Sequence, residues 1–454
     1  MLGDYMKSIF SIKNDLFPLL KLAIPLALTG LVQSAVWFFE TAFLARLGQD
    51  SLAAGALVSW LFGTMAVVLF GTLSSINILV AHKFGAKDQE GISRVLRDGI
   101  ILSAILALPA FLLFWNMADI FLLFGQQNSI VALAESYLHP LAWGILPDFV
   151  LIVFLEFIIG LGHARTIMFF NLFFVTANIL LSYTFIFGKF GAPSLGIAGA
   201  GVGMSLSYWI SAIVLALYVL SSKKYSSYFY NMFSVGKPSY IYELLKVGLP
   251  IGLMYCTEVA FFFALTIAMG YFGSEVLAAN QVALQYMGVF MAMIFSIAQA
   301  ITVRMGHEIG AKNILSAEKA AYSGIFIAAG LMVLVAIIYL FFPEKLISVD
   351  FNVELEKNAG ITELIKQFFV VGAVFQIFEA IRIALFGALR GLKDTRFTLF
   401  VSIVSFWGIA LPGGYVLAQY LKFGGVGFWW SMVFGAVTSV LLLLLRFRKM
   451  ISYL

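Results

Sequence analysis

The sequence predicts an all-α membrane protein with twelve transmembrane helices in two six-helix repeats. Of its 454 residues, 62% are hydrophobic and only 11% are charged, whereas a soluble domain carries roughly 25% charged residues. Apolar runs recur along the whole chain, each long enough to cross a hydrocarbon core about 30 Å thick. A set of landmark residues also recurs at nearly constant spacing. The net charge of +5 follows from loop composition, so we expect no nucleic-acid partner.

Apolar runs between polar breaks define the expected spans in order: 16–46, 53–81, 96–116, 134–159, 166–188, 196–221, 240–272, 278–303, 319–342, 362–389, 397–421 and 425–445. Residues 1–14 carry Lys7 and Lys13 without a short apolar core and cleavage site, so we expect a retained cytoplasmic leader. An even number of spans then leaves both termini in the cytoplasm. Most of the 28 Lys and Arg fall on the cytoplasmic side of this topology, as the positive-inside rule requires. We expect a multi-pass protein of the cell inner membrane.

The two halves repeat each other. Pro25 and the loop Gly85-Ala86-Lys87 have counterparts 225 residues later, in Pro250 and Gly310-Ala311-Lys312. Six spans per half place the repeats in the same orientation, related by a pseudo-two-fold axis along the membrane normal. Parallel repeats of this kind occur in secondary transporters, with the substrate site between the halves. The expected domains are a lobe at 1–221, a cytoplasmic linker at 222–239 and a second lobe at 240–454.

Ionisable residues inside the spans are the first candidates for function, because each costs a few kcal/mol to insert. Six lie well inside the expected spans, away from their ends: Glu40, Asp148, Glu156, Glu258, Glu379 and Arg382. The single Cys256 excludes an intramolecular disulfide. No Cys/His cluster points to a structural metal, so no cofactor is expected beyond a coupling ion.

Glu258 lies in the seventh span after the helix-bending Pro250, and Tyr255 and Phe262 share its helix face. No basic residue lies within one helical turn of it. A buried carboxylate without a partner takes up a proton or coordinates a cation, and both are coupling chemistries. The alternative is a protonated Glu that hydrogen-bonds to a neighbouring helix.

Glu379 shares a helix face with Phe375 and Arg382, and its repeat mate is Asp148. Arg382 is a candidate charge partner at i+3, which would make a structural salt bridge. Arg382 alternatively reaches Asp148 or Glu156 and leaves Glu379 free.

Glu40 stands on the polar face of the first span with Gln33 and Trp37. It is either an acid that lines a cavity or an interfacial acid near Arg46. Further candidates for the substrate cavity are Gln281 and Gln285, at the start of the eighth span. The residues that share a face or a repeat position with the acids are candidates as well: Tyr255, Phe262, Phe375 and Asp148. Aromatic side chains make up 16% of the chain, and aromatic walls around carboxylates suit flat lipophilic cations.

Three segments resemble signatures of the multidrug and toxic compound extrusion (MATE) family, especially its NorM-like branch. The first runs from Gly248-Leu249-Pro250 through Glu258 to the stretch VLAANQVA at 276–283. The second is Glu379 followed by GALRGLKDT at 387–395, and the third is LPGGY at 411–415. With the repeat landmarks, the resemblance extends over essentially the full chain.

The resemblance implies a non-enzymatic antiporter that expels amphipathic organic cations in exchange for Na⁺ or H⁺. It implies that Glu258 and Glu379 are cation-site acids, with Na⁺ as the only metal expected there, that Glu40 is the first-span acid, and that Pro25 bends the first span. This chain departs from the family pattern in having Glu379 where Asp is usual, Phe375 where a hydroxylated aromatic is common, and Arg382 at an uncharged position. The identity of the coupling ion stays open.

Two other functions are compatible with a many-span chain. A lipid-linked oligosaccharide flippase of the same superfamily needs several buried basic residues for pyrophosphate, and Arg382 is the one basic residue in mid-span. An intramembrane protease needs two facing Asp residues or a Ser–His pair within the membrane, and the four His residues lie at span ends or in loops. Export of small molecules across the bilayer is therefore the favoured function, and it requires no obligate protein partner.

Overall fold

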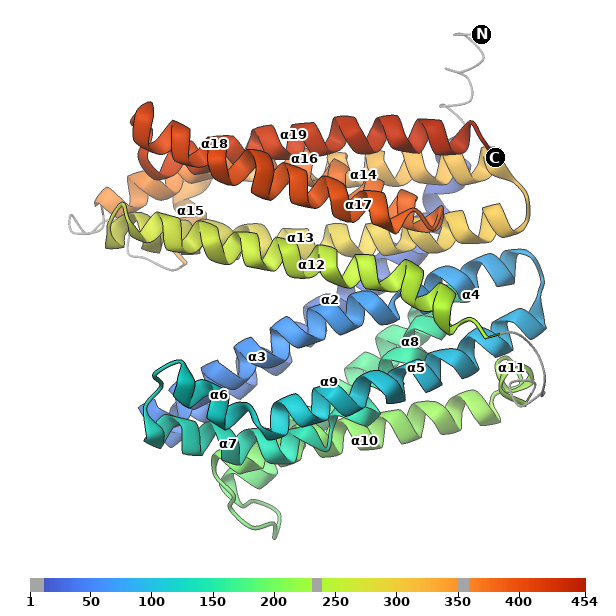
Figure 1. The fold of residues 1–454 in the computed structure, drawn as a ribbon, viewed down its shortest axis with the longest axis horizontal. Coiled ribbons are helices and arrows are strands. Elements are labelled where there is room, and N and C mark those ends of the chain that lie inside the picture. Colours follow the sequence, from blue (N-terminus) through green and yellow to red (C-terminus); the bar gives the residue numbers. More distant parts are fainter. Residues whose placement is uncertain (1–11, 231–238, 350–358) are drawn as a thin grey trace. The chain divides into compact units, whose positions relative to one another are not determined.

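The computed structural model describes residues 12–230, 239–349 and 359–454, and its regular structure within these ranges is helical. The expected leader and the middle of the expected linker lie largely outside the described residues. The helices are α2 Ile12–Leu47, α3 Gln49–Leu73, α4 Ser75–Gly85, α5 Gln89–Trp115, α6 Met117–Leu123, α7 Asn128–Ala142, α8 Ile145–Gly160, α9 Ala164–Phe187, α10 Ile197–Ser221, α11 Ser226–Tyr230, α12 Ile241–Gly270, α13 Ser274–Gly310, α14 Ile314–Phe341, α15 Pro343–Ile347, α16 Ala359–Gly391, α17 Thr395–Ser402, α18 Leu411–Tyr415 and α19 Gly424–Ile451 (Figure 1).

Eleven helical segments in the described ranges are long and apolar enough to cross a membrane. Helices α7 and α8 pass the same test together but are bent by 51°, and they make the twelfth span if the pair is counted as one. Their combined range corresponds to the span expected at 134–159. Pro140 lies near the end of α7 and Pro147 in the first turn of α8, and proline removes a helical hydrogen bond and kinks the helix.

The eleventh span, Thr395–Tyr420, changes its winding along its length. Helix α17 continues into the π-helical segment Ile403–Ala410, and α18 into a second one, Val416–Tyr420. A π-helical turn holds an extra residue, so it rotates the side chains that follow and is frequent at functional sites. This change of winding begins directly after Ser402.

The turns between helices repeat in detail. Lys87 and Lys312 both have a positive φ, of 55° and 61°, which is uncommon for residues other than glycine. The residue that follows each Lys caps the next helix: Asp88 accepts from the Gly91 N–H at 2.8 Å, and Asn313 accepts from the Ser316 N–H at 3.2 Å. The two halves therefore share turn geometry as well as sequence landmarks.

The residues separate into two compact units. The N-terminal unit is Leu28–Gly252, and the C-terminal unit joins Leu253–Leu454 to the described part of Met1–Ala27. Both boundaries lie inside a helix, two residues after Pro25 in α2 and two residues after Pro250 in α12. The boundaries thus fall at equivalent positions of the two repeats.

Within the N-terminal unit, the first part of α12 lies directly on α3. A Cβ at Gly248 would lie 2.0 Å from the Thr72 carbonyl oxygen, and one at Gly252 would lie 2.3 Å from the Val68 carbonyl oxygen. Two small residues four apart let helix backbones approach closely, a common device in membrane proteins. The glycine pair therefore sets the position of this part of α12.

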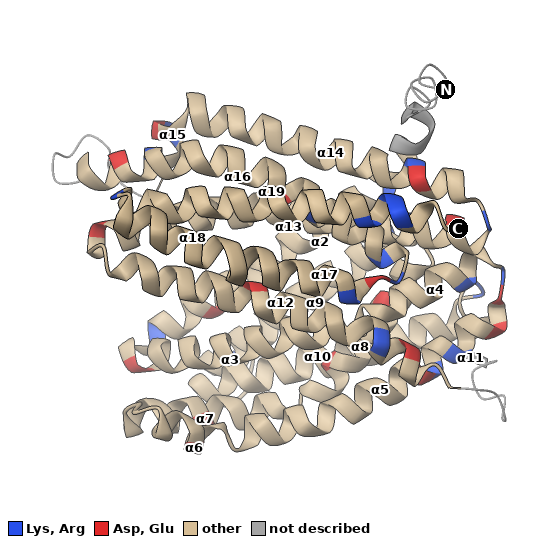
Figure 2. Cartoon of the chain, turned by 45° about the horizontal axis from the view of Figure 1, so that its top comes forward, with Lys and Arg blue, Asp and Glu red and all other residues tan. Residues whose placement is uncertain are grey.

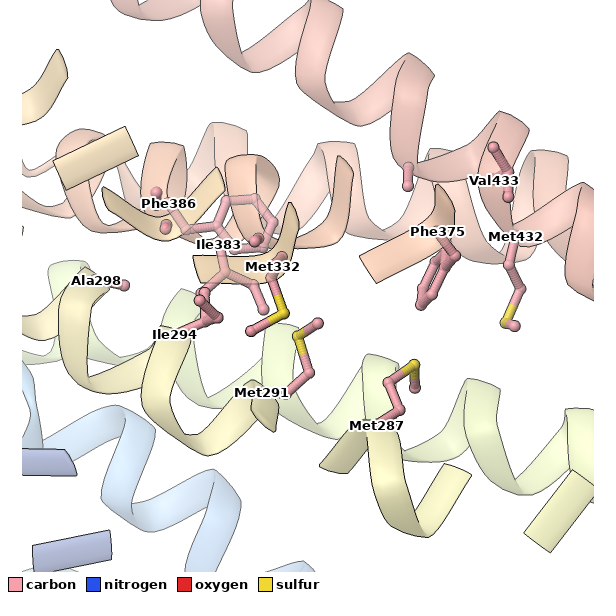
Figure 3. Close-up of a cluster of buried hydrophobic side chains, with 14 of the residues drawn as sticks. Met287, Met291, Ile294, Ala298, Met332, Phe375, Ile383, Phe386, Met432 and Val433 are labelled. Atoms are coloured by element: carbon pink, nitrogen blue, oxygen red, sulfur yellow. The ribbon is translucent and has the colours of Figure 1, made fainter. Parts of the chain in front are cut away.

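The core of the C-terminal unit is built around α16, which packs along α13, α14 and α19 (Figure 1). Met287, Met291 and Met332 belong to this core together with Ile294 and Phe375 (Figure 3). Unbranched methionine side chains fill the irregular space between helices. Charged residues are distributed differently: Figure 2 shows that Lys, Arg, Asp and Glu gather mainly near helix ends and leave long apolar stretches between them.

Candidate functional site

Three buried charges meet in the C-terminal unit, and we name Glu258, Glu379 and Arg382 the acid–arginine triad. The Arg382 Nε donates to Glu379 Oε2 at 2.8 Å, and its Nη2 donates to Glu379 Oε1. The Arg382 Nη1 donates to Glu258 Oε1 at 2.8 Å. The side chains of Glu258, Glu379 and Arg382 are 9%, 6% and 1% exposed. One guanidinium thus binds two carboxylates in an apolar interior.

The helices explain how the triad forms. Glu379 and Arg382 are three residues apart on α16, which places them on one face. Glu258 comes from α12, and Ser402, the last residue of α17, donates its hydroxyl to Glu258 Oε1 at 2.8 Å. The Trp407 indole N–H donates to the Thr257 carbonyl at 3.1 Å and ties the π-helical segment to α12 beside Glu258.

Two aromatic rings pack against the Arg382 guanidinium, one from α16 itself and one from the π-helical segment Ile403–Ala410. The Arg382 Cζ lies 4.5 Å from the centre of the Phe386 ring and 4.8 Å from the centre of the Phe406 ring. Cation–π contacts of this kind stabilise a cation that has lost its water. The rings and the bidentate Glu379 contact together hold Arg382 in one position.

The triad shows which charge partner each of the two acids has. Arg382 pairs with Glu379, as its i+3 spacing allowed, rather than leaving that acid free. Glu258 was expected to lack a salt-bridge partner because its own helix offers none nearby, and that expectation is wrong: its partner comes from α16, 124 residues along the chain. Helical spacing describes one helix and carries no information on what a second helix presents.

A second acidic site lies in the N-terminal unit. Glu40 on α2 and Asp148 in the first turn of α8 are both buried, and both interact electrostatically with the Tyr208 phenol of α10. The Glu40 Oε1 is buried without a hydrogen-bond partner among the described residues. A buried polar atom without a partner costs about 1–3 kcal/mol, so this carboxylate is poorly compensated.

Aromatic rings surround the second site as well. The Tyr208 ring stacks on Phe62 and on Phe174, with ring centres 6.4 and 5.1 Å apart. Trp37 lies 6.2 Å from Phe62, measured between ring centres, and is 40% exposed. The exposed Gln33 donates to Asn171 Oδ1 at 2.8 Å. Glu40, Gln33 and Trp37 therefore lie along α2, as their spacing predicted, and Glu40 and Asp148 both lie within electrostatic range of Tyr208.

The remaining candidates divide into surface and core residues. Gln281 and Gln285 are exposed on α13, whereas Tyr255 and Phe262 are half-buried on α12. The Tyr255 ring lies beneath the guanidinium of Arg390, with the Arg390 Cζ 5.0 Å from the ring centre.

The structure contradicts the role expected for Phe375. It was expected to line a substrate cavity, but it is fully buried in the core of the C-terminal unit among Met287 and Met432 (Figure 3). Its position on the face of Glu379 does not bring it to a surface, because α16 is enclosed by α13, α14 and α19. Phe375 is a packing residue.

Helical spacing did not single out three residues that belong to these sites. Ser402 and Phe406 contact the triad from the eleventh span, and Tyr208 lies within electrostatic range of both acids of the N-terminal unit. A hydroxyl or a ring within an apolar span is too common to stand out. Only the approach of a second helix gives these side chains a role.

Comparison with known proteins gives a single family. The model of the MatE family matches this chain twice, over residues 25–184 and 250–416. The chain is 32% identical over 436 residues to the probable multidrug resistance protein NorM of Pseudomonas aeruginosa, covering 96% of this chain and 89% of that protein. It is 31% identical over 441 residues to the probable multidrug resistance protein NorM of Oceanobacillus iheyensis, covering 96% and 97%.

The fold has solved counterparts. A crystal structure described as MATE in the bent conformation superposes with a TM-score of 0.88 at 22% identity, covering 98% of both chains. An outward-facing multidrug resistance MATE family transporter superposes with a TM-score of 0.86, also at 22% identity, covering 97% of this chain and 96% of that one. The two matches to the family model start 225 residues apart, which is the spacing of Pro25 and Pro250. The chain is therefore a multi-pass membrane protein of the MatE family, the MATE transporters that its motifs resemble, and its relatives include proteins named NorM.

Proposed function

We propose that this protein is a secondary active efflux antiporter that exports amphipathic organic cations in exchange for Na⁺ or H⁺. Membership of the MatE family and relatives named multidrug resistance proteins support the export of small molecules. The exchange reaction proceeds by alternating access, the mechanism of secondary transporters that are built from repeats. The protein lies in the inner membrane with both termini in the cytoplasm, the orientation that its Lys and Arg distribution favours.

A charge imbalance among buried groups carries this proposal. With both acids ionised, the triad of Glu258, Glu379 and Arg382 contains two negative charges and one positive charge. The surplus negative charge in an apolar interior is costly unless a mobile cation or proton neutralises it. Glu40 and Asp148 supply further carboxylates in the N-terminal unit, where no described residue pairs with Glu40 Oε1. Glu258, Glu379 and Glu40 are the coupling acids.

The substrate and the coupling ion exchange because each stabilises a different state. A cation that neutralises the acids favours the state without substrate, and an organic cation that replaces it favours the opposite state. Trp37, Gln33 and Asp148 in the N-terminal unit, and Tyr255, Phe262, Gln281 and Gln285 in the C-terminal unit, are the substrate contacts. A membrane potential supplies about 2.3 kcal/mol per 100 mV for each charge that moves inward.

The flippase alternative lacks support from the buried charges. An anionic pyrophosphate needs positive charge that is free to bind it. The deeply buried Arg382 is already neutralised by two carboxylates.

Reconstitution in proteoliposomes tests the proposed function. Sodium and pH gradients are imposed separately while the movement of a fluorescent cationic dye is followed. We expect one of the two gradients to drive dye transport, and we expect Glu258→Gln to abolish the coupling while the protein stays folded, because the substitution removes the surplus charge and keeps a side chain that accepts from Ser402. Dye movement that responds to neither gradient would refute antiport, and full coupling in the Glu258→Gln protein would refute the assignment of that residue.

A further inference from the structure

The acid–arginine triad has almost no free carboxylate oxygen. Both Glu379 oxygens accept from Arg382, and Glu258 Oε1 accepts from Arg382 and Ser402. Of the four carboxylate oxygens, only Glu258 Oε2 has no hydrogen bond within the described part of the chain. The triad therefore offers one acceptor atom together with one surplus negative charge.

A metal cation does not fit the single free acceptor oxygen of the triad. Hard cations are held by several oxygen ligands at once, whereas three of the four carboxylate oxygens of the triad already accept hydrogen bonds from Arg382 or Ser402. A cation at Glu258 Oε2 would also lie close to the guanidinium, which repels it strongly in a medium of low dielectric constant. The Arg382 side chain is 1% exposed between Phe386 and Phe406, so it cannot simply move aside.

A proton fits the single free oxygen of the triad. One oxygen is enough to hold a proton, and the resulting carboxylic acid leaves the triad neutral, with a Glu379–Arg382 ion pair and an uncharged Glu258. Glu258 is the most exposed member of the triad, at 9% against 6% for Glu379 and 1% for Arg382. Glu258 is also the acid with an oxygen that accepts no hydrogen bond among the described residues, so we assign the exchangeable proton to it.

The surroundings of Glu258 add no second acid. Helix α16 presents Glu379 and Arg382, and one turn away from Glu258 it presents Arg390 over the Tyr255 ring. The eleventh span presents the uncharged Ser402, Phe406 and Trp407. From α12 itself, the part within the C-terminal unit contributes no other carboxylate or amine.

We propose that Arg382 is a built-in counter-cation that determines ion specificity: it occupies the position of a metal ion between Glu258 and Glu379 and leaves the C-terminal unit a single exchangeable proton at Glu258. This inference rests on the proposed antiport function and specifies its ion. In each cycle one proton binds to Glu258 Oε2 from the outside and leaves toward the cytoplasm, with no change in covalent bonding elsewhere. Arg382 acts through the two acids and is a specificity-determining residue.

Sodium binding by the purified full-length protein tests this proposal independently of transport. The thermal unfolding of each variant is followed in sodium chloride and in potassium chloride at equal ionic strength, together with binding of radioactive sodium. We expect Glu258→Gln to leave any sodium effect of the unsubstituted protein unchanged, because the triad does not hold sodium. We expect Arg382→Gln to gain a sodium-dependent rise in unfolding temperature and sodium binding, because two carboxylates are then left without their cation.

A matched double variant separates the loss of the guanidinium from the change in net charge. Glu379→Gln with Arg382→Gln keeps one negative charge at Glu258, so we expect it to lose the sodium response gained by Arg382→Gln. If Arg382→Gln does not fold, the comparison of the unsubstituted protein with Glu258→Gln decides alone. A sodium effect that Glu258→Gln removes overturns the proposal, and one that Glu258→Gln leaves intact supports it.

The carboxyl stretching absorption in infrared difference spectra supplies the proton side of the test. Between high and low pH, the unsubstituted protein should show a protonated carboxyl band that Glu258→Gln lacks, and a band that persists in Glu258→Gln while Glu379→Gln removes it contradicts the assignment. Failure of dye transport in proteoliposomes would instead refute the antiport function, so the two failures are distinguishable.

Discussion

At the scale of single residues, the two acidic sites are compensated in opposite ways. Glu258 and Glu379 share Arg382, which makes charge-assisted contacts to both. Glu40 has a buried oxygen without a hydrogen-bond partner in the described chain, and no described guanidinium or ammonium forms an ion pair with it. The two acids of the C-terminal unit are therefore held by ion pairs within the protein, whereas Glu40 keeps an oxygen that is free to bind a cation or a proton.

The triad predicts a large effect on stability. Arg382→Met removes the guanidinium and leaves two buried carboxylates facing each other, a change that typically costs about 3–5 kcal/mol. We expect a marked fall in the unfolding temperature measured in detergent at neutral pH. The triple variant that adds Glu258→Gln and Glu379→Gln should recover most of the loss, since no uncompensated charge remains. An Arg382→Met protein as stable as the unsubstituted one would show that the guanidinium adds no net stability to the triad.

Glu40 predicts the opposite balance between stability and function. Glu40→Gln removes a poorly compensated buried carboxylate, so we expect an unfolding temperature equal to or higher than that of the unsubstituted protein. Dye transport in proteoliposomes should fall, because the site can no longer exchange a cation. Functional sites commonly sacrifice stability in this way. A variant that loses stability and keeps full transport would identify Glu40 as a structural residue.

At the scale of elements, the helices owe their ends and their spacing to a few local contacts. Asp88 caps α5 through the Gly91 N–H and pairs with Lys83 at 3.0 Å. Burial by itself raises the pKa of Asp88, but the Gly91 N–H and the Lys83 ammonium outweigh it and hold that pKa below its ordinary value. The cap is therefore a charged carboxylate at neutral pH. Its repeat mate, Asn313, caps α14 without a charge.

The repeat supplies a matched control for this cap. Asp88→Ala removes the acceptor of the Gly91 N–H, and losing an N-cap costs about 1 kcal/mol. Asp88→Asn keeps the acceptor, as Asn313 does in the second half, and should retain most of the stability. Thermal unfolding of both variants measures the difference. Equal losses would mean that the charge on Asp88, rather than its hydrogen bond, stabilises the turn.

The contact between α12 and α3 predicts intolerance to a single methyl group. Gly248→Ala would place its Cβ 2.0 Å from a backbone oxygen of α3, so the helices must separate. We expect a clear fall in unfolding temperature, since overpacking typically costs about 1–3 kcal/mol. Gly270→Ala on the same helix is the control, because its Cβ would meet nothing within 4 Å. Equal stability of the two variants would contradict the close approach.

At the scale of the whole molecule, the repeat and the compact units have different boundaries. The repeats divide the chain between the sixth and seventh spans, whereas each compact unit ends two residues after Pro25 or Pro250, inside the first helix of a repeat. Helices α2 and α12 therefore each contribute residues to both units. A proline near each division weakens the helix there by removing one backbone hydrogen bond.

Labelling of introduced cysteines checks the orientation in the membrane. Cys256→Ala removes the native thiol, and Lys224→Cys and Lys422→Cys then place one thiol on each expected side. In intact spheroplasts we expect a membrane-impermeant maleimide to label position 422 only. Both positions should react after the membrane is opened with detergent. Labelling of position 224 alone in intact cells would invert the topology.

The sequence by itself determined the helical membrane class, the repeat and the positions of the charges inside the spans. Apolar runs long enough to span a bilayer are visible without a structure, because in lipid a chain must satisfy its own backbone hydrogen bonds. Charges within those runs stand out because they are costly, so Glu40, Glu258, Glu379 and Arg382 were all identified from their positions. Only the tertiary structure decided their partners. It brought Arg382 of α16 to Glu258 of α12, placed Glu40 and Asp148 within electrostatic range of Tyr208, and buried Phe375 in the core. Helical periodicity governs one helix at a time, and contacts between helices depend on how distant segments pack.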